Sequence, residues 1–286
     1  MTVPRPAATV ILLRDSVDGP EVFLVRRHDR VAFMGGAHVF PGGAVDPGDS
    51  DVDPTWCSGE VPWHTESDEV AAPAFHVAGL RELFEEAGVL IAREPAGRAL
   101  TSPDRDRAWL ANMRHVVHTR QETLRQAVTR HGLRLALDAL IPSAHWVTPP
   151  VRDGRRFDTR FFVARLPLGQ DASHDQHETS ESVWMTPAAA IAAAAHDEIV
   201  LPPPTWTSLR EIDAFRSVDD IVAWARGRQI DRREPDLIEA GGVRMLVMPG
   251  DPRHSGPRLA ATVPETCFVW HGDRWHPEAV DTGGGA

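Results

Sequence analysis

Residues 79–91, Gly-Leu-Arg-Glu-Leu-Phe-Glu-Glu-Ala-Gly-Val-Leu-Ile, decide the fold of this chain. Their apolar side chains recur at helical spacing, which predicts a helix that buries one face and ends just before Gly88. A glycine supplies the left-handed conformation that often ends a helix, and the three apolar residues after it predict the start of a buried strand. The same helix carries Glu82, Glu85 and Glu86 at positions i, i+3 and i+4, so their carboxylates share one face.

This group of carboxylates has two interpretations. Acidic residues on a helix most often form a solvated face, and neighbouring carboxylates repel each other by roughly a few tenths of a kcal/mol. A divalent cation would instead turn that repulsion into ligation, because Mg²⁺ binds one or two carboxylates together with water and substrate phosphate. The sequence around the helix decides between the two.

Residues 81–89, Arg-Glu-Leu-Phe-Glu-Glu-Ala-Gly-Val, resemble the second half of the Nudix box, and residues 40–49 resemble its first half. In that family the box is Gly-x5-Glu-x7-Arg-Glu-U-x-Glu-Glu-x-Gly-U, where U is a bulky aliphatic residue. Here Gly43 is followed, after five residues, by Asp49 where the family has Glu. Thirty-one residues then separate Asp49 from Arg81 in place of seven, so about 24 extra residues split the box.

The resemblance implies a fold and a chemistry. Nudix enzymes share a mixed sheet between helices, which implies an α+β fold of the α/β/α sandwich type. They hydrolyse a diphosphate that joins a nucleoside to another group, and they use Mg²⁺ or Mn²⁺. A bound divalent ion neutralises the diphosphate and lowers the pKa of a bound water, while a carboxylate acts as general base.

The resemblance also assigns roles by position. It implies that the carboxylates of Glu82, Glu85 and Glu86 bind the metal, together with the main-chain carbonyl of Gly43. It also implies that Glu82 and Glu85 take part in catalysis. Arg81 would pair with a box carboxylate and hold it in position.

Two further acids are candidates for catalysis. Many Nudix enzymes use an acid from a loop beyond the core strands, and residues 169–182 are predicted to form a polar loop of that kind. We therefore add Glu181 to the catalytic candidates, with Glu178 as the alternative. Asp49 is shorter than the Glu that it replaces, and the sequence leaves open whether it assists.

Two arginines are candidate phosphate contacts. Arg27 belongs to the basic run 26–30, which is either a solvated loop or a cationic rim for a phosphorylated ligand. Arg156 belongs to a hairpin with Arg152 and Arg155, which is either a solvated tip or a phosphate clamp beside the acidic helix.

Two longer segments indicate a branch of the family. Residues 33–43 contain Phe40 and residues 156–162 contain Arg160, and both residues become candidate substrate contacts. With the split box, these segments resemble the Nudix branch that includes a peroxisomal coenzyme A diphosphatase. The resemblance implies cleavage of CoA or acyl-CoA to 3′,5′-ADP and a phosphopantetheine.

Two alternatives stay open. One is a Nudix pyrophosphatase for ADP-ribose, NADH or another dinucleotide. The other is a sensor that binds a nucleotide without turnover, because Asp49 and the insertion depart from the family pattern. The three retained acids of the helix favour catalysis over sensing.

Composition excludes several classes of protein. The 286 residues are 42% hydrophobic and 25% charged, which is ordinary for a globular chain with a sizeable core. A net charge of -11 argues against binding to nucleic acid or to an anionic membrane. Two cysteines give no disulfide framework, and no apolar run predicts a membrane span or signal peptide, so we expect a cytoplasmic protein. The chain ends without Ser-Lys-Leu, so a peroxisomal address is not expected.

We predict one Nudix domain with two insertions and an extension. Residues 1–227 form the domain, with a loop insertion at 50–78 and a helical insertion at 104–140. The helical insertion is predicted as two or three helices broken near Gly132, and it would serve as a lid, a substrate wall or a homodimer surface. Residues 228–286 are a β-rich extension packed on the same domain.

The remaining elements follow from periodicity and turn residues. The sequence predicts strands at 7–13, 21–26, 38–40, 141–148, 157–166, 183–185, 243–248 and 266–270, and helices at 187–196, 205–215 and 218–228.

Overall fold

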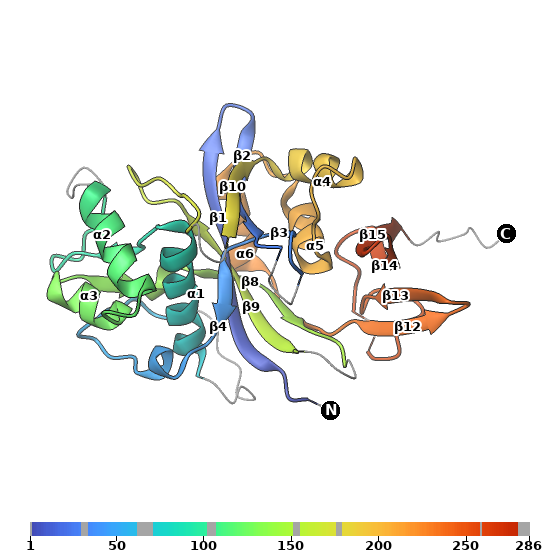
Figure 1. Cartoon of the computed structure of the whole chain (residues 1–286), viewed down its shortest axis with the longest axis horizontal. Coiled ribbons are helices and arrows are strands. Elements are labelled where there is room, and N and C mark those ends of the chain that lie inside the picture. The colour runs from blue at the N-terminus through green and yellow to red at the C-terminus, as the bar shows by residue number, and fades with distance from the viewer. Residues whose placement is uncertain are drawn as a thin grey trace.

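The computed structural model describes residues 2–29, 34–61, 71–101, 107–150, 155–175, 179–257 and 259–279. At its centre lies a mixed sheet of the order β10-β2-β1-β9-β8-β11, to which β3 and β4 add at β2 and β1 (Figure 1). β1 is parallel to β9 and β11 is parallel to β8, while the other pairs are antiparallel. The strands are β1 Arg5–Ser16, β2 Gly19–Arg27, β3 His38–Val39, β4 Gly42–Ala44, β8 Ile141–Val147, β9 Phe157–Arg165, β10 Thr179–Met185 and β11 Arg232–Arg233.

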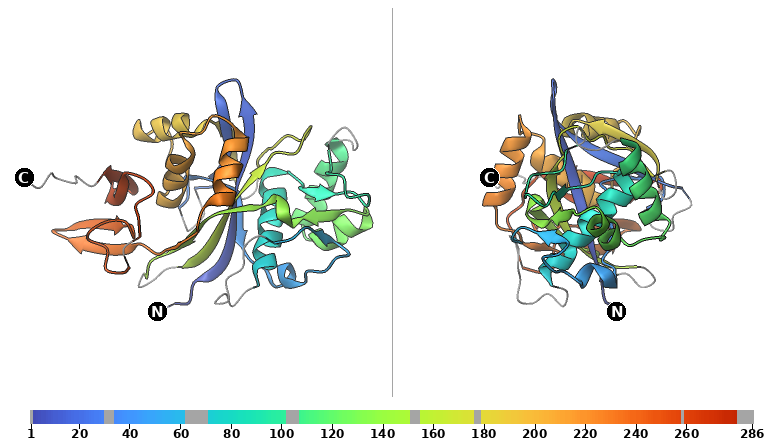
Figure 2. Two further views of the ribbon diagram at one scale, coloured as in Figure 1. Left: turned by 180° about the vertical axis from the view of Figure 1, so that it is seen from behind. Right: turned by 90° about the vertical axis from the view of Figure 1, so that its left-hand side faces the viewer.

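Helices cover both faces of this sheet. α1 (Ala72–Ala87) packs on one face, and α4 (Pro187–Ala195), α5 (Pro203–Ile212) and α6 (Val218–Gly227) lie on the other (Figures 1 and 2). Successive side chains of β1 alternate between the two cores, as the period of a strand requires. The predicted α/β/α sandwich with a mixed sheet is confirmed.

The predicted acidic helix is confirmed as α1. It ends at Gly88, whose φ of 71° is left-handed and whose N–H donates to the carbonyl of Phe84 at 3.0 Å. The expected strand directly after it is wrong, because β6 (Ala92–Arg93) begins later. Gln170 replaces a strand neighbour: its side chain accepts from the N–H of Leu90 and donates to its carbonyl, both at 2.9 Å.

The first insertion and the helical insertion meet in a small sheet of order β5-β7-β6. Cys57–Ser58 form β5 and Arg134–Ala136 form β7, while α2 (Arg107–His118) and α3 (Leu124–Arg130) provide the two helices. The helix expected after Gly132 is wrong. Its leucines alternate with other residues at a period of two, which is the spacing of a strand with one buried face.

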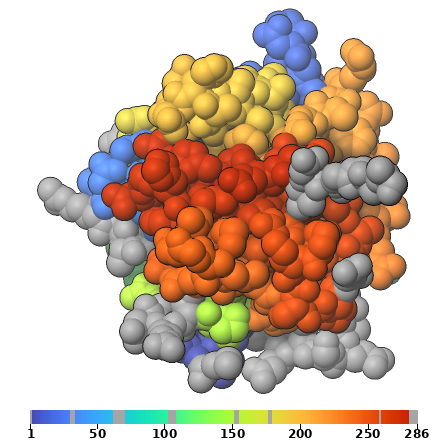
Figure 3. Space-filling model, turned by 90° about the vertical axis from the view of Figure 1, so that its right-hand side faces the viewer, coloured from blue at the N-terminus to red at the C-terminus, as the bar shows by residue number. Residues whose placement is uncertain are grey.

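The C-terminal strands form a separate antiparallel sheet of order β12-β13-β14-β15. Figure 3 shows these strands covering one face of the molecule beside α4. The expected strands near 243–248 and 266–270 are confirmed as β13 and β14, whereas β12 and β15 were not predicted. Their bounds are β12 Asp236–Ala240, β13 Val243–Val247, β14 Glu265–His271 and β15 Arg274–Ala279.

Ion pairs join this sheet to the helices of the larger unit. Arg274 pairs with Asp197 after α4 at 2.8 Å, and Arg210 of α5 pairs with Glu265 at 3.2 Å. The boundary expected at residue 228 stays a prediction. Of the helices in the described ranges, none has the length and apolar character to cross a membrane.

The other strand and helix predictions are confirmed to within three residues at each end, except at the start of β10. β10 begins at Thr179, four residues before the expected start, so part of the expected polar loop is a strand. Thr186 caps α4 by accepting from the N–H of Ala189 at 3.2 Å, as its place before Pro187 predicts. The expected start of the helical insertion at residue 104 lies outside the described residues.

Candidate active site

The acidic face of α1 lies against β4. Glu86 is buried and its Oε2 accepts from the N–H of Gly42 at 3.0 Å. A Cβ atom at Gly43 would lie 2.4 Å from Oε1 of Glu82, so a larger residue would displace that carboxylate. Gly43 therefore lets Glu82 approach the main chain of a strand, and Glu86 reaches the same strand through its hydrogen bond to Gly42.

Arg81 holds the two halves of the split box together. Its Nε and Nη2 donate to the two carboxylate oxygens of Asp49, each at 3.0 Å, and its Nη2 also donates to the carbonyl of Ala44 at 2.9 Å. Its Nη1 lies 2.8 Å from Oε1 of Glu82 and 3.6 Å from Oε1 of Glu85. The insertion of about 24 residues therefore leaves the two halves in contact.

The charges of this network are fixed by burial and pairing. Burial would lower the pKa of Arg81, but its hydrogen bond to Asp49 and the charges of Glu82, Asp49 and Glu85 raise that pKa above its ordinary value, so the guanidinium stays protonated. Burial raises the pKa of Glu85, and the nearby guanidinium partly offsets this rise. Asp49 is 4% exposed and also accepts from the N–H of Asp46 at 2.8 Å, so it positions Arg81.

A cavity of about 1300 Å³ opens beside these groups. This exceeds the volume of roughly 300–1,000 Å³ that is usual for small-molecule sites. Most of the residues that the sequence proposes line this cavity, and they come from α1, from β4 and from neighbouring segments. The proposed residues that line it are Arg27, Phe40, Gly43, Asp49, Arg81, Glu82, Glu85 and Glu86.

The structure places Glu181 elsewhere. It is an exposed residue of β10 opposite Arg26, not a loop residue as expected, and it is outside the set of described residues that line the cavity. Successive side chains of a strand point to opposite faces, so the place of Glu181 in β10 sets the direction of its side chain. The alternative, Glu178, lies outside the described residues.

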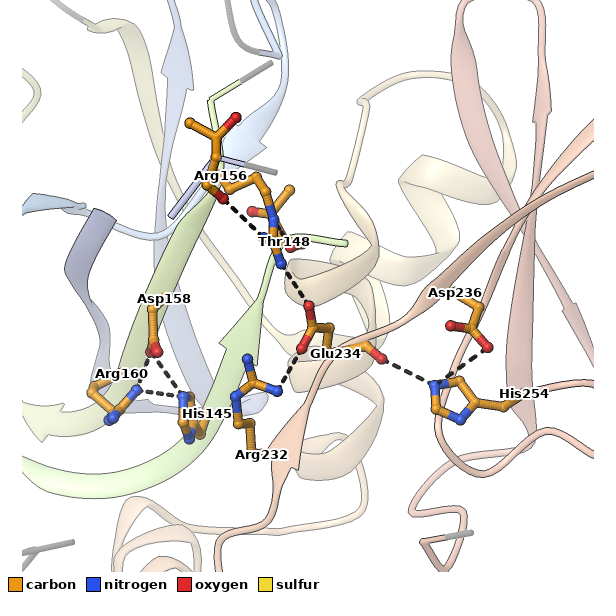
Figure 4. Close-up of polar contacts among 10 residues, drawn as sticks. His145, Thr148, Arg156, Asp158, Arg160, Arg232, Glu234, Asp236 and His254 are labelled. Atoms are coloured by element: carbon orange, nitrogen blue, oxygen red, sulfur yellow. Dashed lines mark hydrogen bonds and ion pairs between the residues drawn. The ribbon is translucent and has the colours of Figure 1, made fainter. Parts of the chain in front are cut away.

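The structure gives two proposed arginines protein partners, and neither arginine is among the described residues that line the cavity. Arg156 donates to Glu234 at 2.6 Å and to the carbonyl of Thr148 at 3.0 Å (Figure 4). Arg160 is 2% exposed and pairs with Asp158, which in turn lies 2.8 Å from Nε2 of His145 (Figure 4). These contacts fix β9 to its neighbours, and a role in substrate binding stays a prediction for both arginines.

Sequence reasoning missed an acid that does line the cavity. Asp175 lies in the loop before β10, where its Oδ1 accepts from the N–H of Thr179 at 2.9 Å. Its charge and that of Glu86 partly offset the fall that burial causes in the pKa of Arg114, so the three groups are neighbours. Asp175 lies in the acidic loop from which a further acid was expected, but the sequence prediction named only Glu178 and Glu181.

The donor set suits a hard divalent cation. Glu82, Glu85 and Glu86 offer carboxylate oxygens beside a glycine whose missing side chain leaves room for the first of them. In the part of the chain that the structure describes, no three acidic, histidine or cysteine side chains already converge on one point. Two of the carboxylates contact Arg81, so ligation would require them to rotate toward a shared ion.

Comparison with known proteins agrees with this geometry. A family model described as the NUDT19 Nudix domain matches residues 63–212. The human protein named acyl-coenzyme A diphosphatase NUDT19 is 30% identical over 282 residues, covering 82% of this chain and 72% of that protein. The chicken protein of the same name is 28% identical over 271 residues, covering 81% and 72%.

A solved structure matches as well. The Nudix hydrolase from Alicyclobacillus acidocaldarius has a TM-score of 0.64 and 28% sequence identity, covering 78% of this chain and 97% of that one. The fold and the box helix thus define a Nudix hydrolase. Within that class, this chain belongs to the family of the NUDT19 Nudix domain.

Proposed function

We propose that this Nudix hydrolase cleaves the diphosphate of CoA or acyl-CoA, giving 3′,5′-ADP and a phosphopantetheine that keeps any acyl group. The observation that carries the proposal is a single cavity that contains the box acids at one place and continues along an apolar wall. The names of the human and chicken relatives support the same substrate class.

Nudix hydrolases generally use divalent metal ions, and Mg²⁺ or Mn²⁺ is the cofactor that we propose here. Glu82, Glu85 and Glu86 would hold it, together with the carbonyl of Gly43. The ion supplies charge neutralisation at the diphosphate and a bound water of lowered pKa. Arg81 keeps its guanidinium among the box acids, where it donates to Oε1 of Glu82 at 2.8 Å.

A general base must reach water, and this requirement selects among the acids. The side chain of Glu85 is 24% exposed and that of Glu82 is 15% exposed, so Glu85 is the first candidate to accept the proton of the attacking water at its carboxylate. Asp175 is the second candidate, since it lines the same cavity. It replaces Glu181 as the loop acid that we propose.

Arg27 is the proposed phosphate contact. It lines the cavity, and its buried Nε has no hydrogen-bond partner among the described residues. A phosphate oxygen would provide a charge-assisted hydrogen bond for that group. Phe40 also lines the cavity and is 2% exposed. It would therefore form part of the apolar wall of the site and would make no polar contact with the substrate.

Product analysis by mass spectrometry tests the proposal. The parent protein and Glu86→Gln would each be incubated with Mg²⁺ or Mn²⁺ and with CoA, acetyl-CoA, ADP-ribose or NADH. We expect 3′,5′-ADP and the matching phosphopantetheine from the two coenzyme A substrates, with the parent protein only.

Other outcomes identify the alternatives. Cleavage of ADP-ribose or NADH, without cleavage of CoA, would reassign the substrate and keep the metal site. Binding of a nucleotide without turnover under either metal would favour a sensor. A cytoplasmic location and a homodimer stay predictions.

A further inference from the structure

One face of the C-terminal sheet forms part of the cavity. Leu237 of β12 pairs in register with Leu246 of β13, so both side chains point to the same side of the sheet. Both line the cavity, as does Trp275 of β15. All three pack with the core on the α4–α6 side of the main sheet.

Aromatic side chains of the main sheet provide the opposite wall. Trp146 of β8 and Phe161 of β9 line the cavity and are buried. Phe157, the first residue of β9, lines the cavity as well. The charged groups that line this end, Arg5, Arg155 and Arg244, are exposed, and Arg244 pairs with Glu239 at 3.0 Å. The interior of this end is therefore apolar, with charge at its rim.

The region near α3 has the opposite character. Arg120 and Arg125 line the cavity there together with the acids Asp51 and Glu122, and Arg125 pairs with Asp51. The guanidinium of Arg125 also lies 5.7 Å from the ring centre of Trp56. The side chains of these two arginines suit a phosphorylated nucleotide better than an alkyl chain, because a guanidinium donates charge-assisted hydrogen bonds to phosphate. The two regions thus match the two halves of an acyl-CoA, with the carboxylates of α1 beside the diphosphate.

Polar contacts attach the C-terminal sheet to the main sheet. Glu234, just before β12, lies between Arg156 and Arg232 and pairs with both (Figure 4). Nε2 of His254 lies 3.0 Å from the carbonyl of Glu234 and 3.8 Å from Asp236 (Figure 4). These contacts hold the start of β12 against β9, which carries the facing aromatic residues.

We propose that the inner face of the C-terminal sheet, at Leu237, Leu246 and Trp275, binds the acyl-pantetheine arm and sets the preference for acyl chain length. This proposal rests on the proposed function and adds the specificity surface. The arm is uncharged and rich in methylene groups, so its transfer from water to these side chains is favourable in proportion to the apolar area covered.

The test compares two neighbouring residues of one strand. Leu237→Ser removes apolar surface from the cavity, whereas Ile238→Ser makes the same change on the opposite face, outside the cavity lining. Each variant would be assayed for kcat/KM with CoA and decanoyl-CoA, and for inhibition by decanoyl-pantetheine and by 3′,5′-ADP. Melting temperatures would verify that both variants fold.

We expect Leu237→Ser to lower kcat/KM for decanoyl-CoA about tenfold and to lower it less for CoA, because loss of a methylene-sized contact in an apolar pocket costs roughly 10- to 200-fold. Decanoyl-pantetheine inhibition should weaken in parallel, while 3′,5′-ADP inhibition and the Ile238→Ser variant should match the parent protein. Equal losses with both coenzyme A substrates, or weaker inhibition by 3′,5′-ADP alone, would overturn the proposal.

Failure of the proposed function gives a different result. If the parent protein does not cleave CoA, calorimetric titration of decanoyl-pantetheine decides the surface by itself. Binding that Leu237→Ser weakens about tenfold, and that Ile238→Ser leaves unchanged, would keep the arm site and reject the reaction. An absence of binding to a folded parent protein would reject the arm site as well.

Discussion

The sequence encodes two parts of the cavity in different ways. The acidic part consists of Glu82, Glu85 and Glu86, and the C-terminal wall is the inner face of the C-terminal sheet at Leu237, Leu246 and Trp275. The acids of α1 need fixed spacing, because Glu82 and Glu86 must meet one strand while Arg81 reaches Asp49. The wall needs only apolar side chains of suitable size on one face of a sheet, as at Leu237. A motif can therefore report the reaction, while the substrate arm is recognised by residues that carry no motif.

The largest effect should come from the acidic part. Glu86→Gln removes the negative charge of a proposed ligand, while the amide oxygen of the new side chain can still accept from the N–H of Gly42. We expect kcat to fall on the order of a thousand-fold, which corresponds to about 4 kcal/mol. Steady-state kinetics with CoA and Mg²⁺ would measure it, with a thermal melt as control. Retention of most activity would exclude Glu86 as a ligand.

Acid should destabilise the helix that carries the box. Burial lowers the pKa of His76 in α1 to about 4, so the native state keeps it neutral. Below about pH 6.5 the unfolded chain binds a proton there, and stability falls until the pH reaches about 4, by about 3 kcal/mol in total. Urea unfolding at pH 7 and pH 4.5 should show a smaller loss in His76→Met. An equal loss in both proteins would assign the effect to other groups.

The contact between β4 and α1 gives the next effect. A side chain at Gly43 would collide with the carboxylate of Glu82, so Gly43→Ala must displace a proposed ligand. Displacement by about 1 Å costs roughly a hundredfold in rate. Kinetics with CoA would measure the loss, and Gly48→Ala is the control because a Cβ there meets no atom within 4 Å. Full activity in Gly43→Ala would show that Glu82 has room to move without loss.

The attachment of the C-terminal wall should give the smallest effect. Glu234→Gln weakens the pair with the buried Arg156, and we expect a loss of stability of about 1–2 kcal/mol with a rise of a few-fold in KM for decanoyl-CoA. Glu94→Gln, which weakens a pair with the exposed Arg98, is the matched control and should change neither. A KM equal to that of the parent protein would separate the attachment of the wall from substrate binding.

Most of the fold could be predicted, because long strands and an amphipathic helix have strong periodicity. The failures lie where a non-local contact replaces the local rule. Gln170 completes the hydrogen bonds of Leu90, so a buried apolar run is not a strand. Leu135 lies in a strand that pairs with two segments distant in sequence. The residues before it follow a helical period, so the change to the period of two of a strand was not recognised.

The site shows the same division. The acids of the box were found because their spacing is local, and Asp49 was found because the box includes its position. Asp175 and the C-terminal wall were missed, since only the packing of distant strands brings them to the cavity. Glu181 was expected in a loop but lies in β10, because the start of that strand could not be located from its polar residues. Its role in catalysis stays untested.

Steady-state kinetics on decanoyl-CoA with four proteins tests the central claim, that one part of the cavity performs the reaction and the other selects the arm. The proteins are the parent, Glu86→Gln, Leu237→Ser and the double variant. We predict that Glu86→Gln lowers kcat with little change in KM, that Leu237→Ser raises KM with little change in kcat, and that the double variant combines the two effects additively in free energy. A Leu237→Ser protein that folds and loses kcat at unchanged KM would contradict this account.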